Sequence, residues 1–178
     1  MVGDPRLNAD ALAPSLLFAA CGLALSFAPL PVRWTSAALA AVAAIAAVIV
    51  SAYVMRPAWT AMAARQATHV CWFGVVVCAA SVYLPVAVSR RFAPKIAPLL
   101  ATGAGLCCGV AVSGQGGGSG LLRALPCLLL SWPAAWLIDR GAAVAVKVVC
   151  SWLLAVAVLA ATLAWLPVTP GYLPDHLE

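Results

Sequence analysis

Long apolar stretches separated by short charged ones dominate this chain. Between successive charges the sequence leaves uncharged runs at 11–32, 34–55, 66–89, 96–122, 124–138 and 141–167, the last interrupted only by Lys147. A helix needs about 20 predominantly apolar residues to cross a bilayer. We therefore expect an all-α, polytopic membrane helical bundle that forms a single transmembrane domain over residues 1–178. Its predicted spans lie near 12–31, 34–55, 67–88, 97–113, 121–138 and 142–166, and a short C-terminal tail follows at 168–178.

The fifth predicted span, at 121–138, decides whether the chain crosses the membrane five or six times. Its uncharged run is short and contains Pro126 and Pro133, so the segment is either a short, Pro-broken span or a re-entrant one. The string before it, residues 113–120, is so rich in glycine that we expect a flexible loop there, after a helix from about 98 to 112. Six spans are the preferred interpretation.

The first two runs are separated by one charge, Arg33. Pro29 and Pro31 come just before it, and proline disfavours continuation of a helix through the residues that precede it. This pattern predicts a tight helical hairpin.

Composition agrees with a membrane location. The chain of 178 residues is 65% hydrophobic and 8% charged, with a mean hydropathy of +1.06, whereas a soluble domain carries roughly 25% charged residues. The net charge of +5 is spread over short loops, which indicates contact with the lipid bilayer and gives no nucleic-acid surface. The first apolar stretch lacks the features of a cleaved signal, so we expect it to be retained. The alanine-rich composition suggests a bacterial protein of the inner (cytoplasmic) membrane.

The basic residues predict the orientation through the positive-inside rule. With six spans, four of them share the side of the N-terminus and six lie on the other side, which becomes cytoplasmic. If the fifth run is re-entrant, two basic residues change sides and the bias reverses. Both alternatives place the C-terminus on the non-cytoplasmic side. The two groups under six spans are Arg6, Arg56, Arg65 and Arg123, against Arg33, Arg90, Arg91, Lys95, Arg140 and Lys147.

A possible nucleophile is Ser119, in the string Gly117-Gly118-Ser119-Gly120. The string matches the G-x-S-G pattern around the serine of rhomboid-type intramembrane proteases, whose base is a histidine on a later span. Here the last span offers only Lys147 as an ionisable group. Under six spans the two residues lie at opposite faces of the membrane, and only a re-entrant fifth segment would bring them together.

Lys147 is the most costly residue of the predicted spans, because a lysine at the middle of a span costs about 2.5–3.5 kcal/mol on insertion scales. It stands six residues after Gly141, roughly 9 Å along a helix, and its four-carbon stem can return the ammonium to the interface over that distance. Snorkelling is therefore the main interpretation. A role in a solute pathway or in contact with a partner subunit is the alternative.

Metal binding has weak support. His69 and His176 are the two histidines of the chain, and under six spans both lie on the outer face. There His69 could meet Asp175, His176 and Glu178, which offer suitable ligand types. Because the two segments are far apart in sequence, nothing in the spacing demands a site, and we expect no cofactor.

Small and sulfur-containing residues point to helix packing. Gly105 and Gly109 form a G-x-x-x-G pattern that Ala101 extends backwards, and such a face allows close approach of another helix, within this chain or on another copy. The cysteines all fall inside apolar runs and form no C-x-x-C pair, so we expect them to act as small hydrophobic residues. They are Cys21, Cys71, Cys78, Cys107, Cys108, Cys127 and Cys150.

These features favour a small multi-pass protein that is not an enzyme. We expect a non-catalytic subunit or accessory protein of a membrane complex, which associates with other membrane subunits or with itself. The alternative is a small, oligomeric ion or solute transporter or channel, with Lys147 and the segment 121–138 near its path. A rhomboid-like serine protease ranks third, because its catalytic base is missing.

Overall fold

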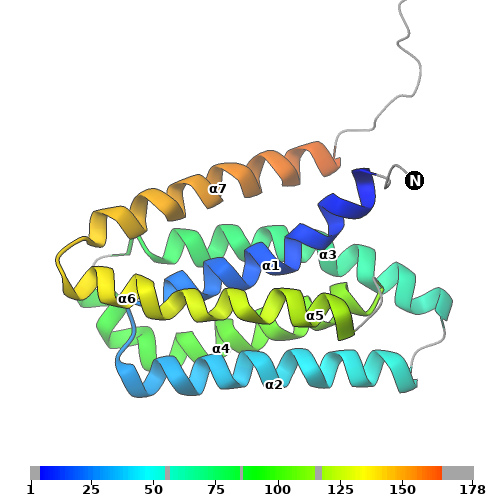
Figure 1. Cartoon of the computed structure of the whole chain (residues 1–178), viewed down its shortest axis with the longest axis horizontal. Coiled ribbons are helices and arrows are strands. Elements are labelled where there is room, and N and C mark those ends of the chain that lie inside the picture. The colour runs from blue at the N-terminus through cyan, green and yellow to red at the C-terminus, as the bar shows by residue number, and fades with distance from the viewer. Residues whose placement is uncertain (1–4, 55–56, 85, 115–117, 166–178) are drawn as a thin grey trace, which may run out of the picture.

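The computed structural model describes residues 5–54, 57–84, 86–114 and 118–165, and every element in these ranges is helical (Figure 1). The all-α prediction is confirmed. The elements are α1 (Pro5–Leu25), α2 (Leu30–Val54), α3 (Pro57–Ser81), α4 (Val86–Ser113), α5 (Gly118–Ala124), the 3₁₀ helix η1 (Leu125–Leu130), α6 (Ser131–Asp139) and α7 (Ala143–Trp165).

Four described helical stretches are long and apolar enough to cross a membrane: Leu30–Tyr53, Pro94–Ser113, Gly118–Asp139 and Ala143–Leu163. Leu12–Leu25 is a shorter apolar helix. The chain is therefore a helical protein with several membrane-competent helices, as the charge pattern predicts.

We call each helical segment that runs along the bundle a leg. The fifth leg, Gly118–Asp139, consists of three consecutive elements, α5, η1 and α6. It runs along the length of the bundle beside α1 (Figure 1). Two sequence predictions for this region are wrong. The segment is not short, because it extends over Gly118–Asp139. Residues 118–120 belong to α5 and not to a loop, because Gly120 packs on the Val112 side chain, where a Cβ would lie 2.8 Å from a methyl carbon.

Proline still shapes this leg. Pro126 stands in the first turn of η1, where its missing N–H interrupts no required hydrogen bond. The α-helical geometry changes to 3₁₀ at this point, so the predicted break is a change of helix type within a continuous leg.

The turns that join the legs are short and locally specified. Between α1 and α2, the amides of Ser26, Phe27 and Ala28 donate to carbonyls three or four residues earlier, and Pro31 falls in the first turn of α2. This confirms the predicted hairpin. After α6, Gly141 has φ +82°, and the amides of Gly141 and Ala142 donate to Ile138 and Leu137. That pair of bonds is the Schellman arrangement, which glycine makes easy.

Most of the helices start earlier than the predicted spans, α3 and α4 by the largest margin. α3 begins at Pro57 and α4 at Val86, ten or so residues before the predicted spans at 67 and 97. Hydropathy locates the apolar part of a helix, but a helix continues into charged flanks where water or lipid headgroups solvate its side chains.

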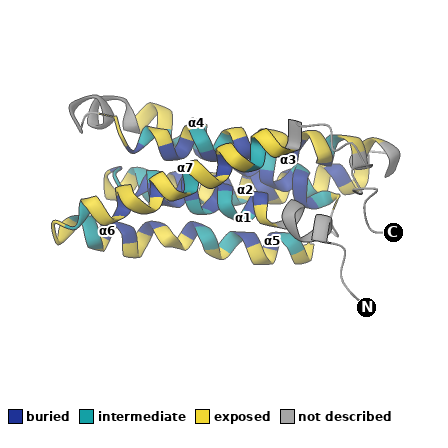
Figure 2. Ribbon diagram, turned by 90° about the horizontal axis from the view of Figure 1, so that it is seen from above, coloured by how far each residue is buried: buried dark blue, intermediate teal, exposed yellow. Residues whose placement is uncertain are grey.

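α1 lies inside the bundle, against α3, α4, the fifth leg and α7. α2 packs mainly on α4, and α7 packs on α3 at the edge of the bundle. Buried residues lie mainly on the helix faces that point toward other helices, and exposed residues lie mainly on the outside (Figure 2). Most buried side chains are small, and the largest fully buried ones are Phe18, Leu17, Val75 and Val112.

Candidate functional site

Ser119 and Lys147 lie near opposite ends of the fifth leg. Ser119 is the second residue of α5, whereas Lys147 is the fifth residue of α7, which starts just after the leg ends at Asp139. At 1.5 Å per residue the intervening helix places them more than about 20 Å apart. Both side chains are exposed. The structure does not bring this pair together, so the geometry offers no Ser–Lys dyad.

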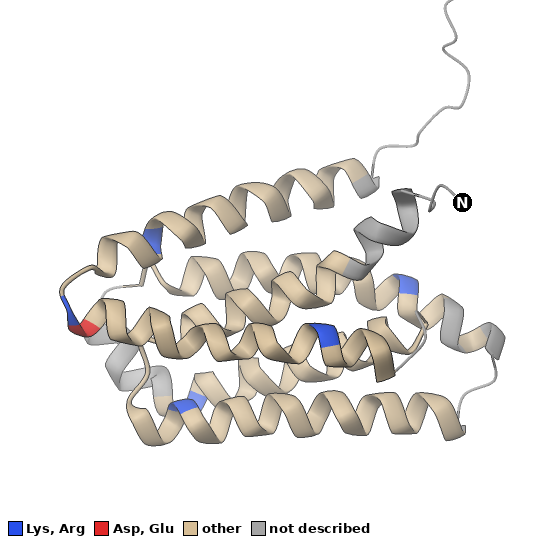
Figure 3. Cartoon of the chain, viewed as in Figure 1, with Lys and Arg blue, Asp and Glu red and all other residues tan. Residues whose placement is uncertain are grey.

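Lys147 stands close to one end of the bundle. Only four residues of α7 precede it, which is about 6 Å of helix. Its backbone carbonyl accepts a hydrogen bond of 2.6 Å from the Tyr83 hydroxyl, which ties α7 to the end of α3. The exposed ammonium is within reach of the interface, as the snorkelling interpretation requires. In Figure 3 most of the described Lys and Arg residues lie toward the two ends of the bundle, whereas one on the fifth leg lies nearer its middle.

The residues proposed for a metal site are not placed together. His69 is exposed on α3, and Asp175, His176 and Glu178 lie outside the described residues. Within the part of the chain that is described, no three histidine, cysteine or acidic side chains form a group that could hold a metal ion.

The G-x-x-x-G face of α4 contacts α2 within the same chain. A Cβ at Gly105 would lie 3.0 Å from the Cα of Ala40, and one at Gly109 would lie 2.7 Å from the Cβ of Ala47. Ala101 is fully buried in the same core. The helix backbones therefore touch along this seam, which is the use that small residues four apart allow.

Cysteine thiols fill the centre of the bundle where α1, α3 and α4 meet. The Cys21 thiol lies against that of Cys78, and the Cys71 thiol against that of Cys108. The Cys108 thiol also donates to the Pro14 carbonyl at 3.4 Å. All seven cysteines are free. Their burial agrees with a packing role for small, polarisable side chains.

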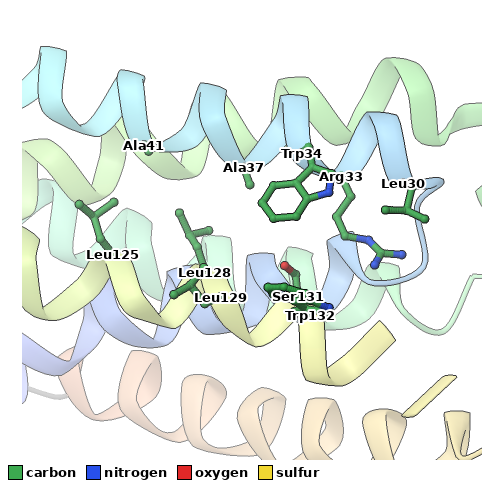
Figure 4. Close-up of a pocket in the computed structure, with 10 residues that line it drawn as sticks. All are labelled: Leu30, Arg33, Trp34, Ala37, Ala41, Leu125, Leu128, Leu129, Ser131 and Trp132. Atoms are coloured by element: carbon green, nitrogen blue, oxygen red, sulfur yellow. The ribbon is translucent and has the colours of Figure 1, made fainter. Parts of the chain in front are cut away.

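A cavity of about 220 Å³ that the sequence did not reveal lies between α2 and the fifth leg (Figure 4). α2 contributes two alanines, a leucine, a tryptophan and an arginine to its wall, and η1 contributes three leucines. The residues that line it are Leu30, Arg33, Trp34, Ala37, Ala41, Leu125, Leu128, Leu129, Ser131 and Trp132. The cavity exists because Ala37 and Ala41 stand where larger side chains would fill the space between the two legs.

Arg33 is the one charged side chain of the cavity wall, and it is half-buried. Its Nη2 donates to the carbonyls of Ser26 and Ala28, at 3.2 and 3.1 Å, and so caps the end of α1. Its Nε is buried and has no hydrogen-bond partner among the described residues. An unsatisfied buried donor costs roughly 1–3 kcal/mol, more when the group is charged.

Two tryptophans stand beside the arginine. The rings of Trp34 and Trp132 meet edge to face, with centroids 6.2 Å apart and an interplanar angle of 72°. Both side chains are also exposed. Exposed tryptophans next to a basic residue near the helix ends are typical of the membrane interface.

Part of this site left a signal in the sequence. Arg33 is the only charge between two long apolar runs, and Trp34 follows it directly. The sequence interpretation treated Arg33 as a loop charge, because nothing in a single sequence says that Trp132, 98 positions beyond Trp34, lies opposite it.

No known protein family, curated protein or solved structure matches this chain. A function for this chain can therefore be inferred only from its own sequence and structure.

Proposed function

We propose that this chain is a non-catalytic subunit or accessory protein of a complex in a bacterial inner membrane. In this proposal it crosses the membrane six times, once with each of its six helical legs, and its C-terminal tail lies on the non-cytoplasmic side. The observation that carries the proposal is the outer face of α7.

α7 exposes large apolar side chains along its whole length. In its most apolar stretch 17% of the residues are buried, against 33–39% in the other three membrane-competent helices, so it is the least covered of the four. The exposed side chains recur every three or four residues, which places them on one helix face. The residues of this face are Val144, Val148, Trp152, Val156, Leu159 and Leu163, and Val149 and Val158 are exposed beside it.

Trp152 distinguishes this face from an ordinary lipid-facing one. It is 76% exposed and stands nine residues from the start of α7, about 14 Å along the helix and near the middle of a hydrocarbon core about 30 Å thick. Tryptophan favours the membrane interface, where its N–H finds a partner. In mid-membrane, an acceptor on a transmembrane helix of another protein would satisfy that N–H.

Most of the hydroxyls inside the bundle are satisfied locally, which supports a role without chemistry or transport; the exception is the fully buried Ser36 hydroxyl, which has no hydrogen-bond partner among the described residues. The buried or half-buried hydroxyls of Ser26, Thr68, Ser81, Thr102 and Ser113 each donate to a carbonyl on their own helix, three or four residues earlier. Asp139, at the end of α6, is the one carboxylate whose side chain the structure describes. Neither these hydroxyls nor the Asp139 carboxylate forms a polar path through the described part of the bundle.

Site-specific photocrosslinking tests the proposal. A photoreactive phenylalanine at position 152 should give a discrete crosslink to a different membrane protein, which also copurifies in mild detergent. The matched control is position 42, where Val42 is 63% exposed on α2 and faces away from the cavity. A crosslink only between copies of this chain, or none at position 152, would contradict the proposed role.

A further inference from the structure

We propose that the cavity between α2 and η1 binds an anionic phospholipid, with one acyl chain between the two legs and the phosphate on Arg33. This inference rests on a membrane location and, for the choice of an anionic lipid, on the six-span orientation of the proposed function, but it does not depend on the accessory role.

The position of Arg33 suits a lipid headgroup. It is the fourth residue of α2, about 5 Å from the start of the helix, and its guanidinium reaches the turn between α1 and α2. Figure 4 shows Arg33 and Leu30 at the loop end of the cavity, with Ala41 and Leu125 at the other end. The cavity thus runs from the helix ends toward the middle of the bundle.

The walls beyond Arg33 suit an acyl chain. Leu125, Leu128 and Leu129 face Ala37 and Ala41 across the cavity. From Arg33 to Ala41 the helix advances about 12 Å, so the apolar walls continue well below headgroup level. Leu129 and Trp132 are themselves exposed on the outside of the bundle, and a lipid chain can therefore enter from the surrounding bilayer.

Unused hydrogen-bond donors indicate the charge of the ligand. A guanidinium has five N–H donors, and the structure gives Arg33 two bonds, both from Nη2. The other three donors have no acceptor among the described residues, and Nε among them is buried. The Ser131 hydroxyl also lines the cavity, with no hydrogen bond of its own in the described part of the chain. Phosphate and ester oxygens supply acceptors only, which matches this set of donors.

The charge balance at this end of the bundle also favours an anionic lipid. With six spans, Arg33 shares its side with Lys95, Arg140 and Lys147, and the positive-inside rule makes that side cytoplasmic. The cytoplasmic leaflet carries anionic lipids, which basic residues near the surface attract.

Native mass spectrometry of the purified full chain tests the charge requirement. The protein is mixed with equal amounts of palmitoyl-oleoyl phosphatidylglycerol and phosphatidylethanolamine, and the first bound lipid is identified. Both lipids carry the phosphate, but the ammonium of phosphatidylethanolamine neutralises its net charge and is repelled by Arg33, so we expect about a tenfold preference for phosphatidylglycerol. Arg33→Gln should abolish that preference, whereas Lys95→Gln, which removes an exposed charge outside the cavity, should keep it. A preference that survives in Arg33→Gln, or that never appears, overturns the proposal.

A second variant fills the cavity and leaves the arginine untouched. Ala37→Leu combined with Ala41→Leu should lower first-lipid occupancy about tenfold, because the added side chains occupy the space of the acyl chain. The control is Ala38→Leu, an exposed position of α2 that does not line the cavity. If Arg33→Gln fails to fold because the end of α1 loses its cap, the comparison of the filled variant with Ala38→Leu tests the proposal without it. Unchanged lipid occupancy in the filled variant overturns the proposal.

Discussion

Adding one methyl group at Gly105 tests whether backbone contact holds α2 and α4 together. A Cβ at this position would meet the main chain of Ala40, including its carbonyl carbon and Cα at 3.0 Å. Ordinary van der Waals contact begins near 3.4 Å, and the Ala40 carbonyl oxygen would be closer to the new Cβ than either carbon, so the helices would have to separate by clearly more than 0.4 Å. Unlike the end of a side chain, a backbone segment cannot rotate out of the way.

The expected cost follows from two opposing effects. Overpacking of a well-packed contact costs typically 1–3 kcal/mol, while replacing a helical glycine with alanine recovers up to about 1 kcal/mol of helix preference. α2 also touches α4 one turn further along, at Gly109, so a tilt that relieves the first contact disturbs the second. We therefore expect Gly105→Ala to lower the free energy of unfolding by about 1–2 kcal/mol.

α4 carries its own control. Gly103 is exposed, and a Cβ there would have nothing within 4 Å, so Gly103→Ala changes the same residue type in the same helix without the contact. We expect its stability to equal or exceed that of the parent by up to about 1 kcal/mol. Unfolding in mild detergent, titrated with a denaturing detergent and followed by tryptophan fluorescence, compares the variants. If Gly105→Ala unfolds at the same midpoint as Gly103→Ala, backbone contact at Gly105 does not stabilise the packing of α2 on α4.

Three further predictions address single features of the structure. Lys147→Met should leave membrane insertion and the unfolding midpoint within about 0.5 kcal/mol of the parent, because an exposed group near a helix end makes no buried interaction; a large loss of stability, measured by the same titration, would mean that its charge is paired. In a background without native cysteines, Ser119→Cys and Arg140→Cys should react with a membrane-impermeant maleimide from opposite sides of the membrane, since Ser119 is the second residue of the fifth leg and Arg140 follows its end; labelling of both from one side would restore the re-entrant alternative. Gly22→Ala should cost less than Gly105→Ala, about 1 kcal/mol or below, because its nearest atom, the Leu128 carbonyl oxygen, is 3.1 Å away; an equal or larger cost in the titration would contradict this ranking.

The charge pattern predicted an all-helical protein with several membrane-competent helices, and the structure has both features in its described residues. Single charges or small charged groups, such as Arg33 and the pair Asp139 and Arg140, fall at or near the turns, because few other positions of so apolar a chain can face water. The pattern failed at the helix ends and in residues 118–120. There, glycine propensity predicted a loop, and tertiary contact with Val112 outweighed it.

The cavity could not be predicted because it depends on which legs are neighbours. Arg33 and Trp132 belong to different legs, and the periodicity of each leg says only that it is apolar on most sides. Such a pattern constrains each helix but not the pairing of helices, since lipid and a neighbouring helix are equally good surroundings for a leucine.

The pairing that the structure does show bears on where a partner can bind. A G-x-x-x-G face predicts close helix contact, and from sequence alone the second helix could belong to another copy of the chain. In the structure α2 already occupies that face of α4, so a second copy could use it only by displacing α2 from the seam at Gly105 and Gly109. Among the four membrane-competent helices, α7 is the least buried, and Trp152 lies near the centre of its exposed face. Association of the folded chain should therefore be sensitive to Trp152→Leu and insensitive to stability-neutral changes in the small-residue seam.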